Sequence, residues 1–331
     1  CILAMAAAIG PAWAQDLPSW NEGPVKDAII DFVTAATTEG GPGWVEPEDR
    51  IATFDNDGTL WTEHPVYFQF MFVSDRIRHL APRHPEWKLQ PPFKGILEGD
   101  TKAVAASGEH GVTELMAVTH AWMTAEAFEE IVSDWISTAR HPRFDRPYDS
   151  LIYQPMVELM DYLRDNGFQT WIVSGGGIDF MRPWADDTYG IPPQQIVGSQ
   201  IAEDYQIIEG KPQFMRKPQV FFVDDGPGKP VGIHRHIGKR PVMAFGNSDG
   251  DYQMLEYTTS GDGPSLAMIV HHTDGDREYA YDRDTHIGRL DKAMTDAPAK
   301  GWHLIDMARE SIELVGGNAR GLLPQDRHEP A

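Results

Sequence analysis

The sequence predicts an α/β fold, in which a parallel β-sheet is crossed by helices and carries an inserted, mostly helical cap. Short apolar stretches typical of buried strands alternate along the chain with amphipathic stretches typical of helices. This alternation favours parallel strands joined by right-handed crossovers. Polar, glycine-bearing motifs follow directly behind the strands, at the carboxyl ends where ligands bind in such sheets. The 331 residues, of which 41% are hydrophobic, suffice for one large domain or for a core with a smaller insertion.

Residues 1–14 are expected to be a truncated signal peptide, which predicts export to the periplasm or out of the cell. The stretch is apolar from Cys1 onward and ends at residues 12–14 in a small-x-small cleavage pattern, although the usual basic start is missing. Cleavage there would make Gln15 the first residue of the mature chain. A buried N-terminal helix and a lipid-modified Cys1 are the alternatives. No stretch of the chain is long and apolar enough for a transmembrane helix, so no membrane insertion is expected.

The charge of the chain argues against a nucleic-acid partner. With 28 Lys and Arg against 50 Asp and Glu, the formal net charge is -22 at pH 7, which repels nucleic acid and anionic lipid. The same surface slows the approach of an anionic small molecule. A phosphate site in this chain therefore requires a local positive charge, from a metal ion and a few placed cations. Cys1 is the only cysteine, so cleavage of the signal peptide would exclude both disulfides and thiol catalysis.

The strands of the predicted sheet can be placed from their apolar composition. A helix near residues 25–36 precedes the first strand at residues 50–54. An amphipathic helix between Tyr153 and Leu163 leads into the second strand at residues 169–173. The remaining strands are expected at residues 195–197, 241–245 and 266–270, with short strands and hairpin turns at about 200–224.

More than 100 residues separate the first two strands, and most of them are typical of helices. Helices are expected at residues 68–80, 112–122 and 125–139, the last with Thr124 as its N-cap. An insertion of this size, directly behind the first polar loop, is expected to lie over the site as a cap. The predicted division is a core of residues 15–62 and 150–331, and a helical cap of residues 63–149.

The loop behind the first strand, residues 55–59, carries two carboxylates that can face one pocket. Gly58 supplies the backbone freedom for the loop to turn between them. Asp55 is the candidate nucleophile that would form an aspartyl-phosphate, and Asp57 is the candidate general acid and base. Asp55 and the backbone carbonyl of Asp57 are also candidate ligands of Mg²⁺, a hard cation that prefers oxygen donors. An Asx-type turn or a calcium loop is the alternative interpretation.

The loop behind the second strand offers donors for phosphate oxygens. Ser174 supplies a hydroxyl group, and Gly175 and Gly176 let backbone N–H groups approach a phosphate closely. A plain tight turn is the alternative. Together with Thr59, these two glycines are candidate substrate-binding residues.

Phosphoryl transfer also needs a cation beside the charge on phosphate and carboxylate. Lys229, at the start of an expected helix before the fourth strand, is the candidate for this role. It is chosen for its placement in the chain, and the competing lysines are Lys211, Lys217 and Lys239.

The loop behind the fourth strand is acidic and contains glycines. Asn247 and Asp251 are candidate ligands that would complete the Mg²⁺ site of the first loop. Asp249 is an alternative ligand. An exposed acidic turn without a metal is the structural alternative.

Taken in order, these four motifs resemble those of the haloacid dehalogenase superfamily. They read Asp55-Asn56-Asp57-Gly58-Thr59-Leu60, Ser174-Gly175-Gly176, Lys229 and Gly246-Asn247-Ser248-Asp249-Gly250-Asp251. The insertion resembles the cap of the phosphoserine phosphatase-like branch of that superfamily, and the resemblance covers about residues 50–255. It implies a Rossmann-like core, bound Mg²⁺ and the catalytic roles given above. The fourth motif departs from the pattern, because Asn247 stands where the family usually has a carboxylate.

The expected function is a magnesium-dependent phosphomonoesterase that acts on a small organic phosphate through an aspartyl-phosphate. A phosphotransferase with the same intermediate and a noncatalytic, calcium-binding exported protein are the alternatives. Two further residues are candidates for substrate binding. Glu63 would hold a cationic group, and Arg182 would hold a carboxylate unless it pairs with Asp179 or Asp186. No role is predicted for residues 271–331.

Overall fold

The computed structural model describes residues 17–311 of the chain. The expected signal peptide at residues 1–14 lies outside these residues. Among the helices of residues 17–311, none has the length and apolar character needed to cross a membrane.

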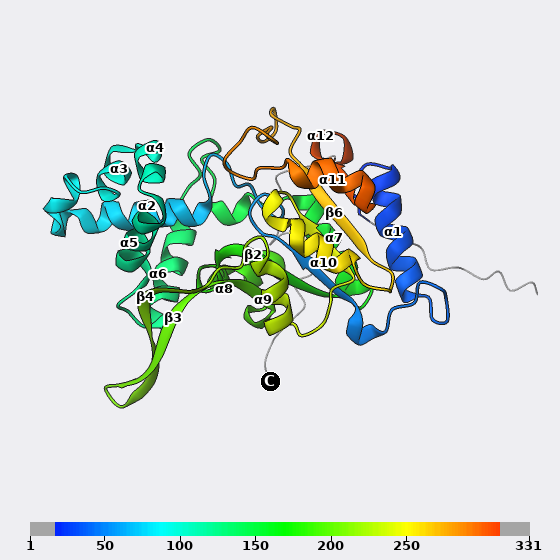
Figure 1. Ribbon diagram of the computed structural model, residues 1–331, viewed down its shortest axis with the longest axis horizontal. Coiled ribbons are helices and arrows are strands. Elements are labelled where there is room, and N and C mark those ends of the chain that lie inside the picture. The colour runs from blue at the N-terminus through cyan, green and yellow to red at the C-terminus, as the bar shows by residue number, and fades with distance from the viewer. Residues whose placement is uncertain (1–16, 312–331) are drawn as a thin grey trace, which may run out of the picture.

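A seven-stranded sheet forms the centre of the molecule, in the order β4-β3-β2-β1-β5-β6-β7 (Figure 1). The strands are β1 Ile51–Phe54, β2 Gln169–Gly177, β3 Ile196–Ile208, β4 Lys211–Phe222, β5 Met243–Gly246, β6 Leu266–His271 and β7 His303–Asp306. All neighbouring strands are parallel except β3 and β4, which form an antiparallel hairpin. The predicted α/β fold with a mostly parallel sheet is confirmed.

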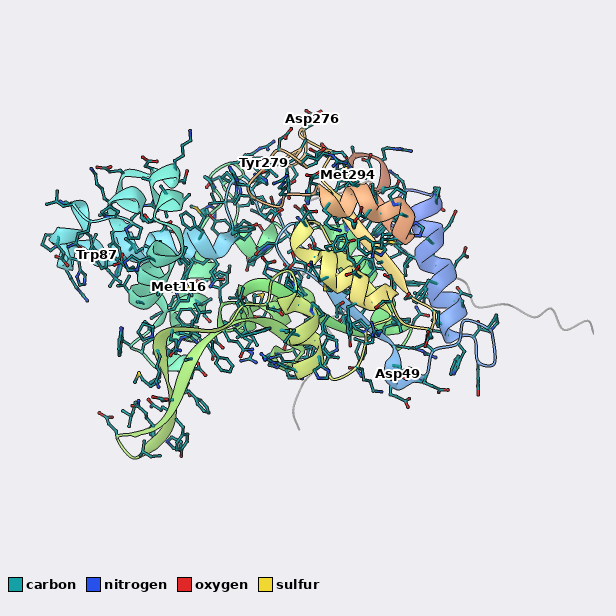
Figure 2. The ribbon with its side chains drawn as sticks, in the orientation of Figure 1. Asp49, Trp87, Met116, Asp276, Tyr279 and Met294 are labelled. Carbon is teal, nitrogen blue, oxygen red and sulfur yellow. The ribbon has the colours of Figure 1, made fainter. Side chains whose placement is uncertain are left out.

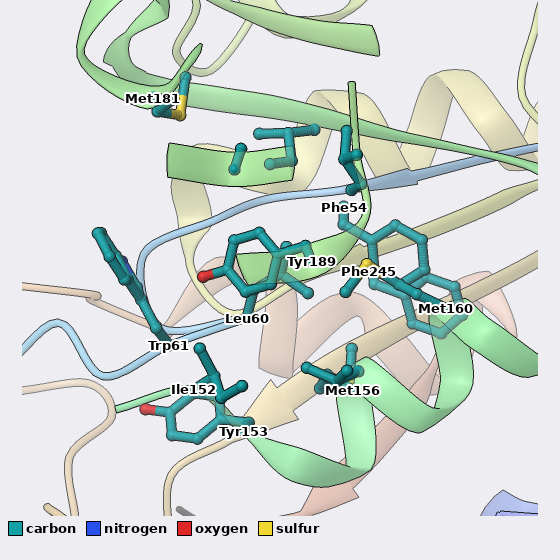
Figure 3. Packing of buried hydrophobic residues seen from close by; sticks show 14 of the residues in the cluster. Phe54, Leu60, Trp61, Ile152, Tyr153, Met156, Met160, Met181, Tyr189 and Phe245 are labelled. Atoms are coloured by element: carbon teal, nitrogen blue, oxygen red, sulfur yellow. The ribbon is translucent and has the colours of Figure 1, made fainter. Parts of the chain in front are cut away.

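Helices cover both faces of the sheet. They are α1 Pro24–Thr37, α7 Gln154–Asp165, α8 Ile178–Tyr189, α9 Gly228–His236, α10 Tyr252–Thr259, α11 Lys292–Lys300 and α12 Met307–Glu310. Successive strand residues point to opposite faces, so Phe245 of β5 joins one apolar cluster and its neighbour Ala244 joins the other. Figure 3 shows Phe245 in the first cluster, close to Phe54 of β1 and Met160 of α7. Burial on both faces explains why these strands are continuous apolar runs.

β1 occupies the middle of the sheet, and this position sets the location of the site. Its residues pair with β2 on one side and with β5 on the other. The rings of Phe54 and Phe245 stack across β1 and β5 with centroids 4.6 Å apart. Because the three strands are parallel, the loops behind them leave the sheet at the same edge.

Between β1 and α7, the chain forms five further α-helices, which make up the inserted segment. They are α2 Phe68–Leu80, α3 Phe93–Glu98, α4 Thr101–Ala106, α5 Gly108–His120 and α6 Ala125–Thr138. Figure 1 shows them grouped beside one edge of the sheet, at the left of the view. α2 has the expected bounds, and the Thr124 hydroxyl accepts a hydrogen bond from the Ala127 amide at 3.1 Å as the N-cap of α6.

Backbone and side-chain contacts hold the insertion against the core. The amide of Trp122 donates to the carbonyl of Arg216 in β4, and the amide of Arg216 donates to the carbonyl of Met123. The buried Arg216 guanidinium lies over the ring of Phe128 at 4.1 Å and donates to the carbonyl of His120 at 2.8 Å. The inserted helices are therefore docked on the hairpin as well as on α8.

Two parts of the sheet differ from the prediction. The hairpin expected at about residues 200–224 is present and turns at Glu209 and Gly210, but its strands are longer than expected, because the strand expected at residues 195–197 continues to Ile208. β7 was not predicted at all. Both segments are only partly buried, with Tyr205 of the hairpin 63% exposed, so they lack the apolar pattern by which the central strands were recognised. The short 3₁₀ segments are Pro47–Asp49, Ala81–Arg83, Pro85–Lys88, Tyr148–Ser150, Pro193–Gln195 and Asp249–Asp251.

Candidate active site

A cavity of about 390 Å³ lies where the loops behind β1, β2 and β5 meet the inserted helices. Its wall on the sheet side contains Asp55, Asp57, Ser174, Lys229 and Asp251. Its opposite wall comes from α2, α4 and α5. The polar residues that the sequence places behind three separate strands are thus brought to one cavity.

Lys229 lies at the centre of this polar cluster. It is the second residue of α9, and its side chain is 1% exposed. The ammonium donates to Asp55 Oδ1 at 2.7 Å, to Asp251 Oδ1 at 2.6 Å and to the carbonyl of Val173 at 2.8 Å. Burial alone would lower the pKa of Lys229, but the two carboxylates outweigh burial and raise it, so Lys229 stays protonated.

The carboxyl group of Asp55 is buried beside this ammonium. Burial raises its pKa to about 8, and the negative charge of Asp251 acts in the same direction against the opposing effect of Lys229. The backbone amide of Asp55 donates to the carbonyl of Phe245 at 2.9 Å, which fixes the start of the loop on β5. A cation next to Asp55 would counteract the burial and favour the carboxylate form.

Asp57 is held by an indole. Trp61 Nε1 donates to Asp57 Oδ1 at 2.6 Å, and Trp61 itself is fully buried and stacked on Trp184 with ring centroids 4.4 Å apart. Burial raises the pKa of Asp57 to about 6, although the hydrogen bond from Trp61 lowers it. A carboxyl with this pKa can both give and take a proton near neutral pH, as a general acid and base must.

The loop at the end of β2 provides hydroxyl and amide groups. Ser174 is buried, and its Oγ accepts a hydrogen bond from the amide of Gly176 at 3.1 Å. Ser174, Gly175 and Gly176 all line the cavity. The next amide, of Gly177, donates to Gln69 Oε1 of α2 at 2.8 Å, so this loop is tied directly to the inserted helices.

The acidic residues of the loop behind β5 have different partners. Asp251 Oδ2 accepts from the amides of Asn247 at 2.9 Å and Ser248 at 3.0 Å, while its Oδ1 contacts Lys229. The carboxylate of Asp249 accepts from the amides of Asp291, Lys292 and Ala293 and so caps α11. Asp249 is a structural cap and does not line the cavity.

Asn247 lies behind the first loop and connects it to Glu63. Thr59 Oγ1 donates to Asn247 Oδ1 at 3.3 Å, and Asn247 Nδ2 donates to Glu63 Oε1 at 2.7 Å. Glu63 lines the cavity, but only 1% of it is exposed, and burial raises its pKa well above the usual value. A Cβ atom on Gly58 would overlap both Asn247 Nδ2 and Glu63 Oε1, and Gly58 has φ +72°, so only glycine fits at this position.

Two candidate substrate-binding residues do not line the cavity. Thr59 is fully buried and donates to Asn247. Arg182 donates to the carbonyl of Pro193 at 3.3 Å and to Asp179 at 3.4 Å, which is the pairing given above as the alternative to substrate binding. Neither side chain is among those that face the site.

The carboxyl groups around the cavity repel one another when ionised, and a hard divalent cation would offset that repulsion. Within residues 17–311 no three His, Cys, Asp or Glu side chains are already gathered as a metal site. However, the cavity is lined by five carboxyl residues against the single ammonium of Lys229, and the pKa values of Asp55 and Asp57 are raised. The carboxylate of Asp55 and the backbone carbonyl of Asp57 would hold Mg²⁺ here as oxygen donors, which leaves the Asp57 carboxyl free to exchange a proton. The other two candidate ligands already have hydrogen-bond donors. Asn247 Oδ1 accepts from Thr59, and Asp251 Oδ1 accepts from Lys229.

The segment from His272 to Asp291 supports the first loop from behind, a role that the sequence did not suggest. His272 Nε2 donates to the carbonyl of Gly58 at 2.7 Å, and Tyr281 Oη donates to Glu63 Oε1 at 2.7 Å. Glu278 is fully buried and lies 3.4 Å from His272 Nδ1. Burial would raise the pKa of Glu278, but hydrogen bonding to His272 and the charge of that ring lower it below the usual value. The segment has no regular strand or helix, so no periodic pattern marks it in the sequence.

Comparison with known proteins identifies a family. A family model described as haloacid dehalogenase-like hydrolase matches residues 52–256, more than half of the chain. A protein of unknown function from Bordetella pertussis is similar with a TM-score of 0.48 and 14% identity, over 78% of this chain and 98% of that chain. One from Anaerococcus prevotii has a TM-score of 0.44 and 18% identity, over 76% and 86%. A phosphoserine phosphohydrolase-like protein from Francisella tularensis has a TM-score of 0.38 and 18% identity, over 67% and 87%. At these TM-scores the structural likenesses support no functional conclusion, and no curated protein sequence matches the chain.

Proposed function

Because the chain belongs to the haloacid dehalogenase-like hydrolases, we propose that it is a magnesium-dependent phosphatase that hydrolyses a small organic phosphate monoester. One observation supports this proposal above the others. The Asp55 carboxyl lines the cavity, and the ammonium of Lys229 lies 2.7 Å from its Oδ1. Asp57 lines the same cavity. A nucleophile, a cation and a proton donor are thus available at one place.

The proposed reaction has two steps. In the first, an Asp55 oxygen attacks phosphorus, the bond from phosphorus to the alcohol oxygen breaks, and Asp57 gives its proton to that oxygen. In the second, Asp57 takes a proton from a water molecule whose oxygen attacks the aspartyl-phosphate. Inorganic phosphate leaves and the Asp55 carboxylate is restored.

The other residues bind charge and hold geometry. The Ser174 hydroxyl and the backbone amides of Gly175 and Gly176 are proposed to donate to the non-reacting phosphate oxygens. Lys229 offsets the mutual repulsion of Asp55 and Asp251 and fixes the orientation of the nucleophile. Mg²⁺ held by Asp55 and Asp57 would neutralise charge on the phosphate as it approaches the carboxylate. We place the enzyme in the periplasm or outside the cell, on the basis of the sequence of residues 1–14 alone.

The test is turnover of p-nitrophenyl phosphate by the purified protein, with Mg²⁺ and with EDTA. Turnover is expected with Mg²⁺ and is expected to disappear in EDTA. Asp55→Asn should abolish turnover without unfolding the protein, because the change is nearly isosteric. Asp204→Asn, the same change on the exposed hairpin, should retain it. Full activity of Asp55→Asn, or activity unaffected by EDTA, would overturn the proposal.

A further inference from the structure

The two walls of the cavity differ in chemistry. The sheet-side wall is polar and charged, as described above. The wall on the side of the inserted helices is apolar, and its residues come from α2, α4 and α5. They are Phe70, Val73, Val104, Val112, Leu115 and Met116. Figure 2 shows Met116 on the side of the inserted helices that is nearer to the sheet.

The cavity offers no cation to the part of a ligand that lies against the apolar wall. Among the cavity-lining residues of the described chain, Lys229 is the one Lys, Arg or His. Its ammonium already contacts two carboxylates, at 2.7 and 2.6 Å. Asp225 also lines the cavity, so a second negative charge on a ligand would meet a further carboxyl group and no second cation.

The polar groups on the helix side are uncharged, and part of their hydrogen-bonding capacity is already used. Gln69 Oε1 accepts from the amide of Gly177, and Gln69 Nε2 lies 3.1 Å from His120 Nε2. His120 supplies no charge, because burial lowers its pKa to about 3. Tyr67 Oη accepts from the amide of Gly288 at 3.4 Å. A carboxylate or second phosphate placed here would lose its hydration and find only uncharged donors, with no cation to balance its charge.

We propose that the cavity selects phosphate esters whose alcohol portion is compact, apolar and free of negative charge. The proposal rests on the proposed phosphatase function and specifies its substrate class. The phosphoryl group lies at the Asp55 wall, and the alcohol portion is buried against Phe70, Leu115 and Met116. Removal of that apolar surface from water provides binding energy. The phosphoryl group and the alcohol portion share a volume of about 390 Å³, which suits a compact alcohol.

Two non-hydrolysable ligands of similar size separate the effect of charge from that of shape. Butylphosphonate has an apolar tail, and 3-phosphonopropionate has a tail of about the same length that ends in a carboxylate. Titration calorimetry of each into the wild-type protein with Mg²⁺ should show butylphosphonate binding at least about tenfold more tightly, a difference of about 1.4 kcal/mol. Equal affinities, or tighter binding of 3-phosphonopropionate, would overturn the proposal.

A substitution in the apolar wall tests the location of the effect. Met116 lines the cavity and is half-buried, so Met116→Arg can place a cation at the alcohol end of the cavity while its long side chain still reaches solvent. It is expected to reduce the preference for butylphosphonate or to reverse it, whereas Met116→Leu is expected to keep the preference. Circular dichroism and thermal unfolding establish that both variants are folded. If folded Met116→Arg kept the wild-type preference for butylphosphonate, the apolar wall would not be the part of the cavity that determines ligand selectivity.

Turnover is measured separately, so that the two proposals can fail independently. If butylphosphonate is preferred but neither butyl phosphate nor p-nitrophenyl phosphate is hydrolysed, the cavity has the proposed selectivity and the phosphatase proposal is wrong. If both esters are hydrolysed while 3-phosphonopropionate binds as well as butylphosphonate, the enzyme is a phosphatase and the selectivity proposal is wrong.

Discussion

Asp57 and Trp61 show how a single contact sets the chemistry of the site. The carboxyl of Asp57 is buried, and that burial raises its pKa to about 6. The indole of Trp61 donates to it at 2.6 Å and limits the rise. The Trp61 side chain is fixed by its stacking on Trp184, so the aromatic core holds the donor in place. Core packing and proton transfer are therefore coupled through one residue.

A pH prediction follows from the pKa of Asp57. Asp57 must be protonated to donate to a poor leaving group, so kcat/KM for butyl phosphate should fall above pH ~6, by about tenfold per pH unit. p-Nitrophenyl phosphate has a leaving group that needs no proton, and its kcat/KM should lack this fall. Trp61→Phe removes the hydrogen bond that lowers the pKa, so it should shift the fall toward higher pH. pH profiles of kcat/KM for both esters check this. An equal fall for both would show that Asp57 is not the acid.

Lys229 offsets the electrostatic repulsion between the buried carboxyl groups of Asp55 and Asp251. Its contacts with Asp55 and Asp251 balance charge in a region that is almost inaccessible to solvent. Breaking such a buried pair leaves an uncompensated charge and costs about 3–5 kcal/mol. Removal of the ammonium that contacts Asp55, the proposed nucleophile, would therefore also destabilise the fold at this edge of the sheet.

At the scale of elements, the loop behind β5 contacts both the cavity and the start of α11. Asp251 faces the cavity and binds Lys229, whereas Asp249 points the other way and caps α11. The loop therefore fixes the position of a helix that packs beside the site. An acidic loop in the sequence does not reveal this division of roles, because it depends on where α11 begins.

Asp249→Ala is expected to lower the free energy of unfolding by about 1–2 kcal/mol, since the amides of Asp291, Lys292 and Ala293 at the start of α11 lose their acceptor. Its affinity for Mg²⁺ should equal that of the wild type. Denaturant unfolding and calorimetric titration with Mg²⁺ measure the two quantities. A clear loss of Mg²⁺ affinity in a folded variant would show that Asp249 takes part in the metal site.

The segment from His272 to Asp291 positions the first loop by close packing. Gly288 has φ +60°, and a Cβ atom there would overlap Glu63 Oε1. Gly301 has φ +70°, but a Cβ atom there would meet no other atom within 4 Å, so it shares the backbone conformation without the contact. Gly301 is therefore a control for Gly288, because the two differ in the Cβ overlap and have a similar backbone conformation.

Gly301→Ala is expected to cost about 1–3 kcal/mol through backbone conformation alone. Gly288→Ala should cost more than that, because Glu63 must move, and it should also lower kcat/KM for p-nitrophenyl phosphate. Unfolding curves and kinetics of both variants give the comparison. Equal destabilisation with unchanged kinetics in both would mean that the segment does not position Glu63.

At the scale of the whole molecule, the architecture could be predicted wherever burial is complete. β1, β2, β5 and β6 are apolar runs in the middle of the sheet, so their composition revealed them. The motifs behind these strands could then be placed together, because parallel strands end at one edge. The outer hairpin and β7 are partly exposed, and their patterns are correspondingly weak.

The candidate site was predictable to a similar degree and for the same reason. Asp55, Asp57, Ser174 and Lys229 follow strands or begin a helix at the sheet edge, and the structure brings them to one cavity. Long-range contacts could not be foreseen. The bond from Asn247 to Glu63 and the contact of His272 with the first loop depend on packing between distant segments.

The most direct test of the account is detection of phosphate on Asp55 itself. In Asp57→Asn the second step lacks its base, while p-nitrophenyl phosphate needs no acid in the first step. The variant is therefore expected to accumulate the aspartyl-phosphate, and mass spectrometry after an acid quench should find one phosphoryl group on the peptide that contains Asp55. If wild-type protein hydrolyses the ester while this peptide stays unmodified in the folded variant and a different residue carries the phosphate, Asp55 is not the nucleophile.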